Sequence, residues 1–285
     1  MATVAVVGGG NQIAAALLPR LVDAGVDVRV LSRRPPPPWI PDAAAAGWST
    51  TLDGDTAAVD ALIWLAPLGL FPHLRVCLGR IGRIIAFSST SASVKRQSSS
   101  AAERTLASTL EGGEATVRGG ASIEGTPCAI LRPTLIYGRG LDRNLTRIAH
   151  WAGRRRFFPL AHEGRGLRQP VHADDLAALA ADLALRPTAV DGRWIVPGGE
   201  RLSYREMVVR VYRSLGKVPR FVHVPITAVR TALAALQPFG MLPGLDAAMF
   251  DRMGDDLVFD GEPARDELGF APRGFSPGFE TWREP

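Results

Sequence analysis

The stretch Val7–Leu17 reads VGGGNQIAAAL and joins an apolar run to a helix-favouring one. The residues before it, Thr3–Val7 (TVAVV), form the continuous apolar run that is typical of a strand buried on both faces of a parallel sheet. Ile13–Ala24 has the apolar spacing of a helix and is followed by Gly25, and Val26–Leu31 predicts a second strand. Strand, glycine turn, helix and strand thus fit within about thirty residues, the length of a βαβ unit.

The glycine run has the composition of a phosphate-binding turn. Such a turn lets the backbone approach a pyrophosphate, and the next helix supplies free N–H groups and the positive end of its dipole. The spacing GxGxxG fails at Ile13, whereas GxxGxxG places Gly8, Asn11 and Ala14, of which Asn tolerates a left-handed backbone and Ala is small enough for close packing. A tight turn without a ligand is the alternative. The residues expected to contact a dinucleotide here are Gly8, Gly10, Asn11, Gln12 and Ile13.

The end of the second predicted strand bears on the choice of cofactor. In a dinucleotide-binding fold this position carries an acid for the ribose 2′-hydroxyl or a basic residue for a 2′-phosphate. The sequence there is Ser32-Arg33-Arg34, with no acid. A guanidinium grips a phosphate with two hydrogen bonds, and Ser32 adds a hydroxyl donor. The triplet favours NADP(H) over NAD(H); the alternative is a pair of solvated arginines.

The rest of the first half continues the alternation of strands and helices. Further strands are predicted at Trp48–Leu52, Ala61–Ala66, Arg83–Phe87 and Cys128–Leu131, with a helix from Ala101 to Leu110 that extends to about Ala121. This order predicts a Rossmann-like, doubly wound parallel sheet of the α/β class. Beyond Gly138 the pattern turns mostly helical. The predicted helices are Arg143–Gly153, Ala173–Leu185, Tyr204–Leu215, Thr227–Leu236 and Leu245–Met253, with extended pieces at Arg193–Val196 and Arg220–Val224.

Composition limits the possible partners. The net charge of +5 comes from scattered residues that are almost all arginine, and no nucleic-acid-binding motif accompanies them, so we expect no nucleic-acid partner. No apolar stretch is long enough for a membrane span. The first strand begins at Thr3 and leaves no room for an export signal, which predicts a cytoplasmic protein. Cys77 and Cys128 lie in apolar segments and are expected to be buried thiols, with no metal site.

With these elements in place, the chain resembles the extended branch of the short-chain dehydrogenase/reductase superfamily, which includes NAD(P)-dependent nucleotide-sugar epimerases and dehydratases. Four segments in matching order carry the likeness: GGGNQIA at 8–14, IIAFSSTS at 84–91, LRPTLIYG at 131–138 and QPVHADDLA at 169–177. The resemblance implies a Rossmann domain that binds NADP(H), formed by residues 1–138 with about 169–197. It implies a smaller substrate lobe formed by about 139–168 and 198–285. Homodimer formation stays open.

The family's catalytic groups are only partly present. Its members use a Ser/Thr hydroxyl, a Tyr as acid or base, and a Lys four residues after the Tyr, arranged around a developing oxyanion. Thr90 matches the hydroxyl, with Ser89 beside it. The Tyr-x-x-x-Lys signature is missing, because Ser100 and Arg104 stand where Tyr and Lys are expected. The residues expected along the cofactor at the strand ends are Ala66, Pro67, Ser88 and Pro133.

Other residues must therefore take over the missing roles. Arg104 is expected to hold the nicotinamide ribose, and Tyr137 or a bound water is expected to move the proton; the alternative for Tyr137 is packing beneath the substrate loop. His172 is a weaker candidate acid, because its segment also suits a helix cap. Arg132 is either an ion-pair partner or a substrate contact. The leading hypothesis is an oxidoreductase, epimerase or dehydratase acting on a nucleotide-sugar or similar polar metabolite, and the alternative is a non-catalytic NADP(H)-binding sensor or scaffold.

Overall fold

The computed structural model describes residues 1–50, 57–75, 78–142, 144–225, 227, 231 and 250–283. Several predicted features lie outside these residues. They are the end of the third predicted strand at Leu52, the thiol Cys77, and most of the predicted helices Thr227–Leu236 and Leu245–Met253. Within them, no helix has the length and apolar character needed to cross a membrane.

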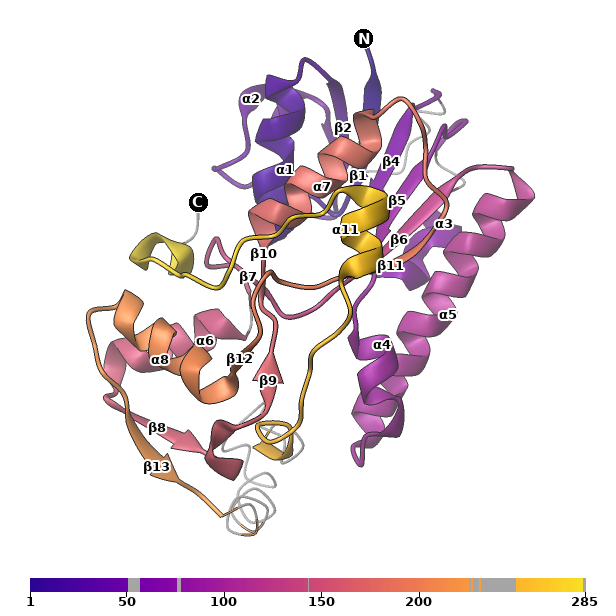
Figure 1. The fold of residues 1–285 in the computed structure, drawn as a ribbon. Coiled ribbons are helices and arrows are strands. Elements are labelled where there is room, and N and C mark those ends of the chain that lie inside the picture. The colour runs from indigo at the N-terminus through magenta and orange to yellow at the C-terminus, as the bar shows by residue number, and fades with distance from the viewer. Residues whose placement is uncertain are drawn as a thin grey trace.

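Seven strands form one sheet, and every neighbouring pair in it is parallel (Figure 1). The strand order is β11-β6-β5-β4-β1-β2-β3, which is the order of a doubly wound sheet with β1 at the centre of the nucleotide-binding half. The α/β fold predicted from the sequence is therefore confirmed. The strands are β1 (Thr3–Val7), β2 (Asp27–Leu31), β3 (Trp48–Ser49), β4 (Ala61–Trp64), β5 (Ile84–Phe87), β6 (Cys128–Pro133) and β11 (Gly192–Val196).

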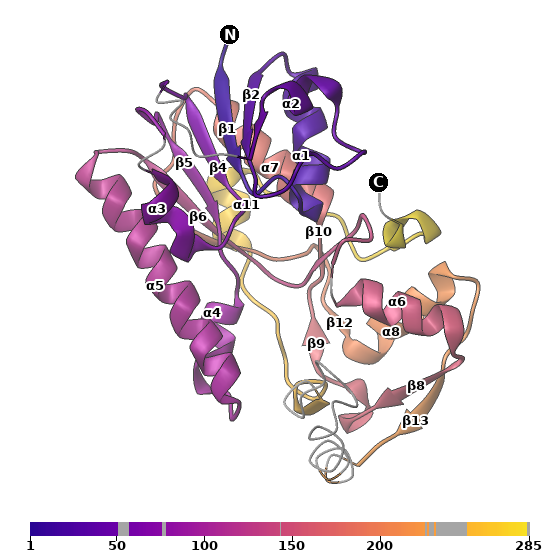
Figure 2. The same ribbon diagram turned by 180° about the vertical axis from the view of Figure 1, so that it is seen from behind.

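Helices cover both faces of the sheet because successive residues of each buried strand point to opposite sides (Figures 1 and 2). On β1, for example, Val4 and Val6 belong to the core beneath one helix layer, whereas Ala5 and Val7 belong to the other. The first layer holds α1 (Gln12–Asp23), α2 (Asp42–Ala46), α7 (Ala173–Leu185) and α11 (Glu262–Leu268); the second holds α3 (Phe71–Arg75) and α5 (Ala101–Ile123).

The turn between β1 and α1 depends on close backbone contact. Gly8 has a φ of 98°, and a Cβ on it would lie 2.8 Å from the backbone nitrogen of Ala66. A side chain at this position would therefore both strain the backbone and push β1 away from the end of β4. Gly10 is different, because a Cβ there would meet nothing within 4 Å. The backbone of Gly10 is open to an approaching ligand.

A smaller lobe lies at the carboxyl edge of the sheet (Figure 1). Two helices and a parallel strand pair pack there around their own apolar clusters, which include Phe158, Tyr212 and Met207. Its elements are α6 (Leu145–Arg154), α8 (Tyr204–Ser214), β8 (Phe157–Leu160) and β13 (Arg220–His223). Short pairs of strands join it to the sheet domain: β7 (Ile136–Tyr137) with β10 (Val171–His172), and β9 (Leu167–Arg168) with β12 (Leu202–Ser203).

The last part of the chain does not stay in this lobe. In α11, Ala264 and Leu268 are buried in the core that α1 and α7 share with the sheet, and Phe270 follows them. The sequence assigned all of 198–285 to the substrate lobe, so the packing of residues 264–270 departs from the predicted boundary. The reason is apolar burial, since these residues cover the outer strand β11.

Candidate functional site

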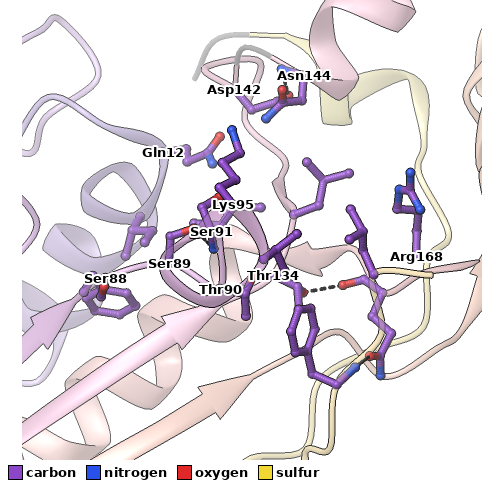
Figure 3. A pocket seen from close by; sticks show the side chains of 18 of the residues that line it. Gln12, Ser88, Ser89, Thr90, Ser91, Lys95, Thr134, Asp142, Asn144 and Arg168 are labelled. Carbon is purple, nitrogen blue, oxygen red and sulfur yellow. Dashed lines mark hydrogen bonds between the residues drawn. The ribbon is translucent and has the colours of Figure 1, made fainter. Parts of the chain in front are cut away.

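A cavity of about 550 Å³ lies at the carboxyl edge of the sheet, between the glycine turn and the lobe. This volume is in the usual range for small-molecule sites. Figure 3 shows polar side chains from the sheet domain and from the lobe around it. From the sheet domain come Asn11, Gln12, Ile13, Leu65, Phe87, Ser88, Ser89, Thr90, Ser91, Val94 and Lys95; from the later segments come Thr134, Leu135, Ile136, Leu141, Asp142, Asn144, Arg168, Gln169, Arg252, Leu257 and Phe259.

Six of the residues predicted from the sequence line this cavity together: Asn11, Gln12, Ile13, Ser88, Ser89 and Thr90. The remaining predicted residues are outside its lining: Gly8, Gly10, Ser32, Arg33, Arg34, Ala66, Pro67, Arg104, Pro133 and Tyr137.

Asn11 is the N-cap residue of α1. Its φ is −118°, so the left-handed conformation that asparagine tolerates is not used at this position. Its Oδ1 accepts hydrogen bonds from the N–H groups of Ile13 (2.9 Å) and Ala14 (3.0 Å), and its Nδ2 donates to the carbonyls of Gly8 and Leu65. Two N–H groups of the first turn are thus already held by this side chain. A pyrophosphate would bind the N–H groups that precede them or displace the Asn11 amide.

The glycine turn fits a dinucleotide in two further respects. The Oε1 atom of Gln12 is buried and, among the described residues, has no hydrogen-bond partner although Gln12 lines the cavity. Arg33 and Arg34 are exposed just beyond the end of β2, and within the described part of the chain neither has an ion-pair partner. The guanidinium groups are donors that suit a phosphate, whereas the Gln12 oxygen is an acceptor that suits a hydroxyl or amide N–H donor of a bound dinucleotide.

Thr90 lies where β5 passes into the short helix α4 (Ser91–Val94). It is 8% exposed, and both its N–H (3.1 Å) and its Oγ1 (3.2 Å) donate to the carbonyl oxygen of Pro133 on β6. Pro133 therefore contacts the cavity only through Thr90, which it fixes by these two hydrogen bonds. This explains why Pro133 is outside the cavity lining although the sequence placed it along the cofactor. The Oγ of Ser89 accepts from the N–H of Ser91 and orders the start of α4.

Ser88 is tied to a buried ion pair. Its Oγ donates to Glu114 on α5, and Glu114 also pairs with Arg132 and Arg193. Glu114 is 1% exposed, and Arg132 reaches it through two hydrogen bonds of 2.7 Å. Of the two roles left open for Arg132, ion-pair partner is the one observed. This network fixes α5 against the ends of β5 and β6.

Tyr137 is packed away from the cavity. It is 1% exposed, and its ring contacts the rings of His172 and Phe275 edge to face at 4.9 Å. Burial raises the pKa of Tyr137 to about 12, which makes it a poor proton donor near neutral pH. The proton-transfer role expected for Tyr137 does not match this environment, whereas the packing alternative does. His172 serves as the cap of α7, because its Nδ1 accepts from the N–H of Asp174.

Arg104 also lies elsewhere than expected. It projects from the exposed side of α5, and its Nη1 donates to the carbonyls of Ser98 and Ser99. It caps the turn that precedes its own helix, and it is not among the cavity residues. This placement does not match the predicted contact with a nicotinamide ribose.

Besides Arg168, two cations that the sequence did not single out line the cavity, Lys95 and Arg252. They share one carboxylate: the Nζ of Lys95 lies 3.0 Å from Oε1 of Glu103, and Arg252 donates to Oε2. Burial opposes ionisation of Glu103, but hydrogen bonds from Ser98 and Lys95 and the charge of Arg252 together hold its pKa below the usual value. Lys95 follows Thr90 by five residues, a position that strand-end reasoning could have included; Arg252 comes from far along the chain and gave no such signal.

The lobe side of the cavity is built from residues that are already bonded. Asp142 accepts from the N–H groups of Asn144 and Thr146 at the start of α6. Arg168 is 6% exposed and donates to the carbonyls of Leu167, Asp255 and Arg252, which joins the lobe to the segment after residue 250. Figure 3 shows Arg168 on the far side of the cavity from Ser88 and Ser89.

Comparisons with known proteins place this fold. No protein-family model matches the chain. The chain is 28% identical over 152 residues to the uncharacterized protein y4nG of Sinorhizobium fredii, a match that covers 53% of this chain and 37% of that protein. The chain therefore matches little more than a third of the length of this relative.

Solved structures match nearly the whole chain. The epimerase Mth375 of Methanothermobacter thermautotrophicus has a TM-score of 0.74 at 16% identity, over 98% of this chain and 90% of that one. The WbmF enzyme of Bordetella bronchiseptica, solved with NAD⁺, has a TM-score of 0.70 at 18% identity, over 99% and 91%. A UDP-glucuronic acid 4-epimerase of Bacillus cereus was solved with UDP-glucuronic acid and NAD. Its TM-score is 0.70 at 15% identity, over 98% of this chain and 97% of that one. This chain shares its fold with these enzymes.

Proposed function

We propose that this protein is an NADP(H)-dependent oxidoreductase of the epimerase and dehydratase type, acting on a nucleotide-sugar or similar polar metabolite. One observation carries the proposal: a single cavity joins the start of α1, the hydroxyl of Thr90 and the lobe. The similar structures solved with NAD and with a UDP-sugar support the ligand classes.

Different residues of this chain bind different parts of the cofactor and the substrate. Gly8 and Gly10 bring the backbone close to the pyrophosphate, and the N–H groups at the start of α1 face it. Arg33 and Arg34 bind the 2′-phosphate, with Ser32 beside them. A bound nicotinamide supplies or accepts a hydride. Thr90 orients the reacting oxygen of the substrate, because Pro133 fixes its backbone and its hydroxyl lies at the cavity wall.

A second candidate function is a non-catalytic NADP(H)-binding sensor or scaffold. The observation in its favour is that, among the described residues, no tyrosine lines the cavity and no residue of α5 does so either. The family's tyrosine and lysine come from that helix, so the usual proton-transfer pair has no counterpart there.

The first experiment is a thermal-unfolding series with saturating NADP⁺, NADPH, NAD⁺ and NADH. A ligand present at 100 times its Kd stabilises the folded state by about 2.7 kcal/mol. That gain raises the Tm by roughly 2–4 °C per kcal/mol for a chain of this size. A shift confined to NADP⁺ and NADPH supports the proposed cofactor. No shift with any dinucleotide would rule out both candidates. Oxidation of NADPH with a panel of nucleotide-sugars and small carbonyl compounds then separates the enzyme from the sensor.

A further inference from the structure

Lys95 is one of only two lysines in the chain, and the two have different surroundings. Lys217 donates to the carbonyls of Ala152 and Gly153 at the end of α6, where it caps the helix. Lys95 instead lines the cavity. It begins a one-turn 3₁₀ helix (Lys95–Gln97) that follows α4. Helix capping explains Lys217 fully, whereas it leaves Lys95 unexplained.

The ammonium of Lys95 is held in place from the side of α5. Its Nζ lies 3.0 Å from Oε1 of Glu103, and the two side chains are 22% and 11% exposed. The other oxygen of Glu103 accepts from Ser98 (2.7 Å) and from Arg252. Because a carboxylate with three donors is fixed in orientation, it fixes the ammonium as well. An ammonium has three N–H donors, and within the described part of the chain only Glu103 accepts from Lys95, so two remain for a ligand in the cavity.

Glu103 belongs to the helix that provides tyrosine and lysine in the family that this chain resembles. Here the inner face of α5 carries Glu103, Ala107 and Glu114, and Arg104 points outward. The helix therefore acts on the cavity indirectly, by orienting a lysine from the neighbouring turn. Thr90 and Lys95 flank α4 at its two ends, so one helical turn links the hydroxyl and the ammonium.

From these contacts we propose that Lys95 is the catalytic proton donor of the reaction, with Glu103 as its positioning residue; this inference rests on the proposed function. When a carbonyl is reduced, its carbon gains the hydride that the dinucleotide supplies, and its oxygen gains a proton. Lys95 gives that proton through the broken N–H bond, becomes a neutral amine, and recovers a proton from water. The hydroxyl hydrogen of Thr90, which is donated to the carbonyl of Pro133 in this structure, turns toward the same oxygen.

The test uses the small number of lysines. In the Lys217→Arg variant, reductive methylation with ¹³C-formaldehyde labels Lys95 as the only lysine, and the N-terminal amine gives a separate resonance. The labelled resonance is titrated against pH with NADP⁺ and then with NADPH. The charged groups around Lys95, namely Glu103, Arg252, Arg168 and Asp142, are identical in both titrations. The two ligands differ by one positive charge on the nicotinamide ring.

If Lys95 lies beside the nicotinamide, its midpoint is lower with NADP⁺ than with NADPH by about 0.5 to 2 pH units. The matched control is Lys95→Arg, in which Lys217 is the labelled lysine and its midpoint is expected to be the same with both ligands. Equal midpoints for Lys95, in a protein that both dinucleotides stabilise, overturn the proposal and leave the proposed function intact. If neither dinucleotide stabilises the protein, the proposed function fails, and the inference fails with it.

A second measurement addresses the proton itself. With any compound that supports NADPH oxidation, Lys95→Arg keeps the charge and the contact to Glu103 but holds its proton too firmly to give it away. Loss of a general acid lowers kcat by roughly 10²-fold or more, while KM and the Kd for NADPH stay within about threefold. An unchanged kcat excludes Lys95 as the donor.

Discussion

Glu114 and Arg132 form a two-bonded ion pair under the carboxyl edge of the sheet, with Nε–Oε1 and Nη2–Oε2 distances of 2.7 Å each. The carboxylate of Glu114 is almost fully buried. It also accepts a hydrogen bond from Ser88 and forms an ion pair with Arg193. The pair connects α5 to β6, so the wall of the cavity depends on it.

We expect Glu114→Gln to destabilise the protein by about 3 to 5 kcal/mol, because it leaves a guanidinium buried without its counter-charge. Urea unfolding followed by circular dichroism measures the loss. The control is Glu111→Gln on the same helix, whose partner Arg96 is largely exposed, and which should change stability by no more than about 0.5 kcal/mol. Similar losses in the two variants would contradict the structural role of the buried pair.

Replacing both Arg33 and Arg34 by alanine should weaken NADP⁺ binding by about tenfold to a hundredfold and leave NAD⁺ binding nearly unchanged. The reason is that only the 2′-phosphate needs these guanidinium groups. Isothermal titration with each dinucleotide gives the two Kd values. Arg20→Ala combined with Arg80→Ala, which removes two exposed arginines elsewhere on the surface, is the control for the change in net charge. Equal weakening for both dinucleotides would refute the assignment.

Asn11→Asp should raise the Kd for either dinucleotide by about tenfold or more, because a carboxylate caps the helix as well as the amide does but repels the pyrophosphate. Asn11→Ser is the matched variant: it keeps a capping oxygen, loses the same Nδ2 hydrogen bonds and adds no charge. The ratio of the two Kd values isolates the electrostatic effect. A ratio near one would mean that phosphate binds away from the start of α1.

Thr90→Ala should lower turnover at least tenfold without unfolding the protein, because the hydroxyl lies at the cavity wall and its loss removes one of the two donors proposed for the substrate oxygen. Thr90→Ser should recover most of the rate. Tyr137→Phe should leave turnover unchanged, since the phenol is packed between two rings outside the cavity. NADPH absorbance gives the rates, and an inactive Tyr137→Phe that is folded would restore the tyrosine as the proton donor.

Glu103 makes stability depend on pH in a defined direction. Its folded pKa is below the usual glutamate value of 4.5, so its ionised form stabilises the folded state above that value and the contribution disappears as the pH falls through the folded pKa. The stability difference between the native protein and Glu103→Gln should therefore be constant near neutral pH and shrink below about pH 4.5. Urea unfolding at a series of pH values measures it, with the exposed Glu280→Gln as a control. A difference that grows on acidification would show the opposite shift.

Local sequence determined the βαβ unit and the parallel sheet. Short apolar runs such as Thr3–Val7 that end in a glycine turn are typical of central strands, and the glycine at position 8 is required where β1 meets the end of β4, so periodicity and a few turn residues were sufficient. The hydroxyls of Ser89 and Thr90 were also found this way, because the end of a parallel strand always lies at the same edge of the sheet.

Tertiary packing decided the rest. Spacing along α5 suggested Arg104 as the cation of the site, but the rotation of that helix on the sheet is set by burial of Ala107 and Glu114, which turns Arg104 outward and Glu103 inward. The ion pairs of Glu103 then bring together Lys95 and Arg252, which lie 157 residues apart in the chain (252 − 95). Sequence periodicity records which residues are apolar, and it contains no information on which distant charges compensate one another once water is excluded.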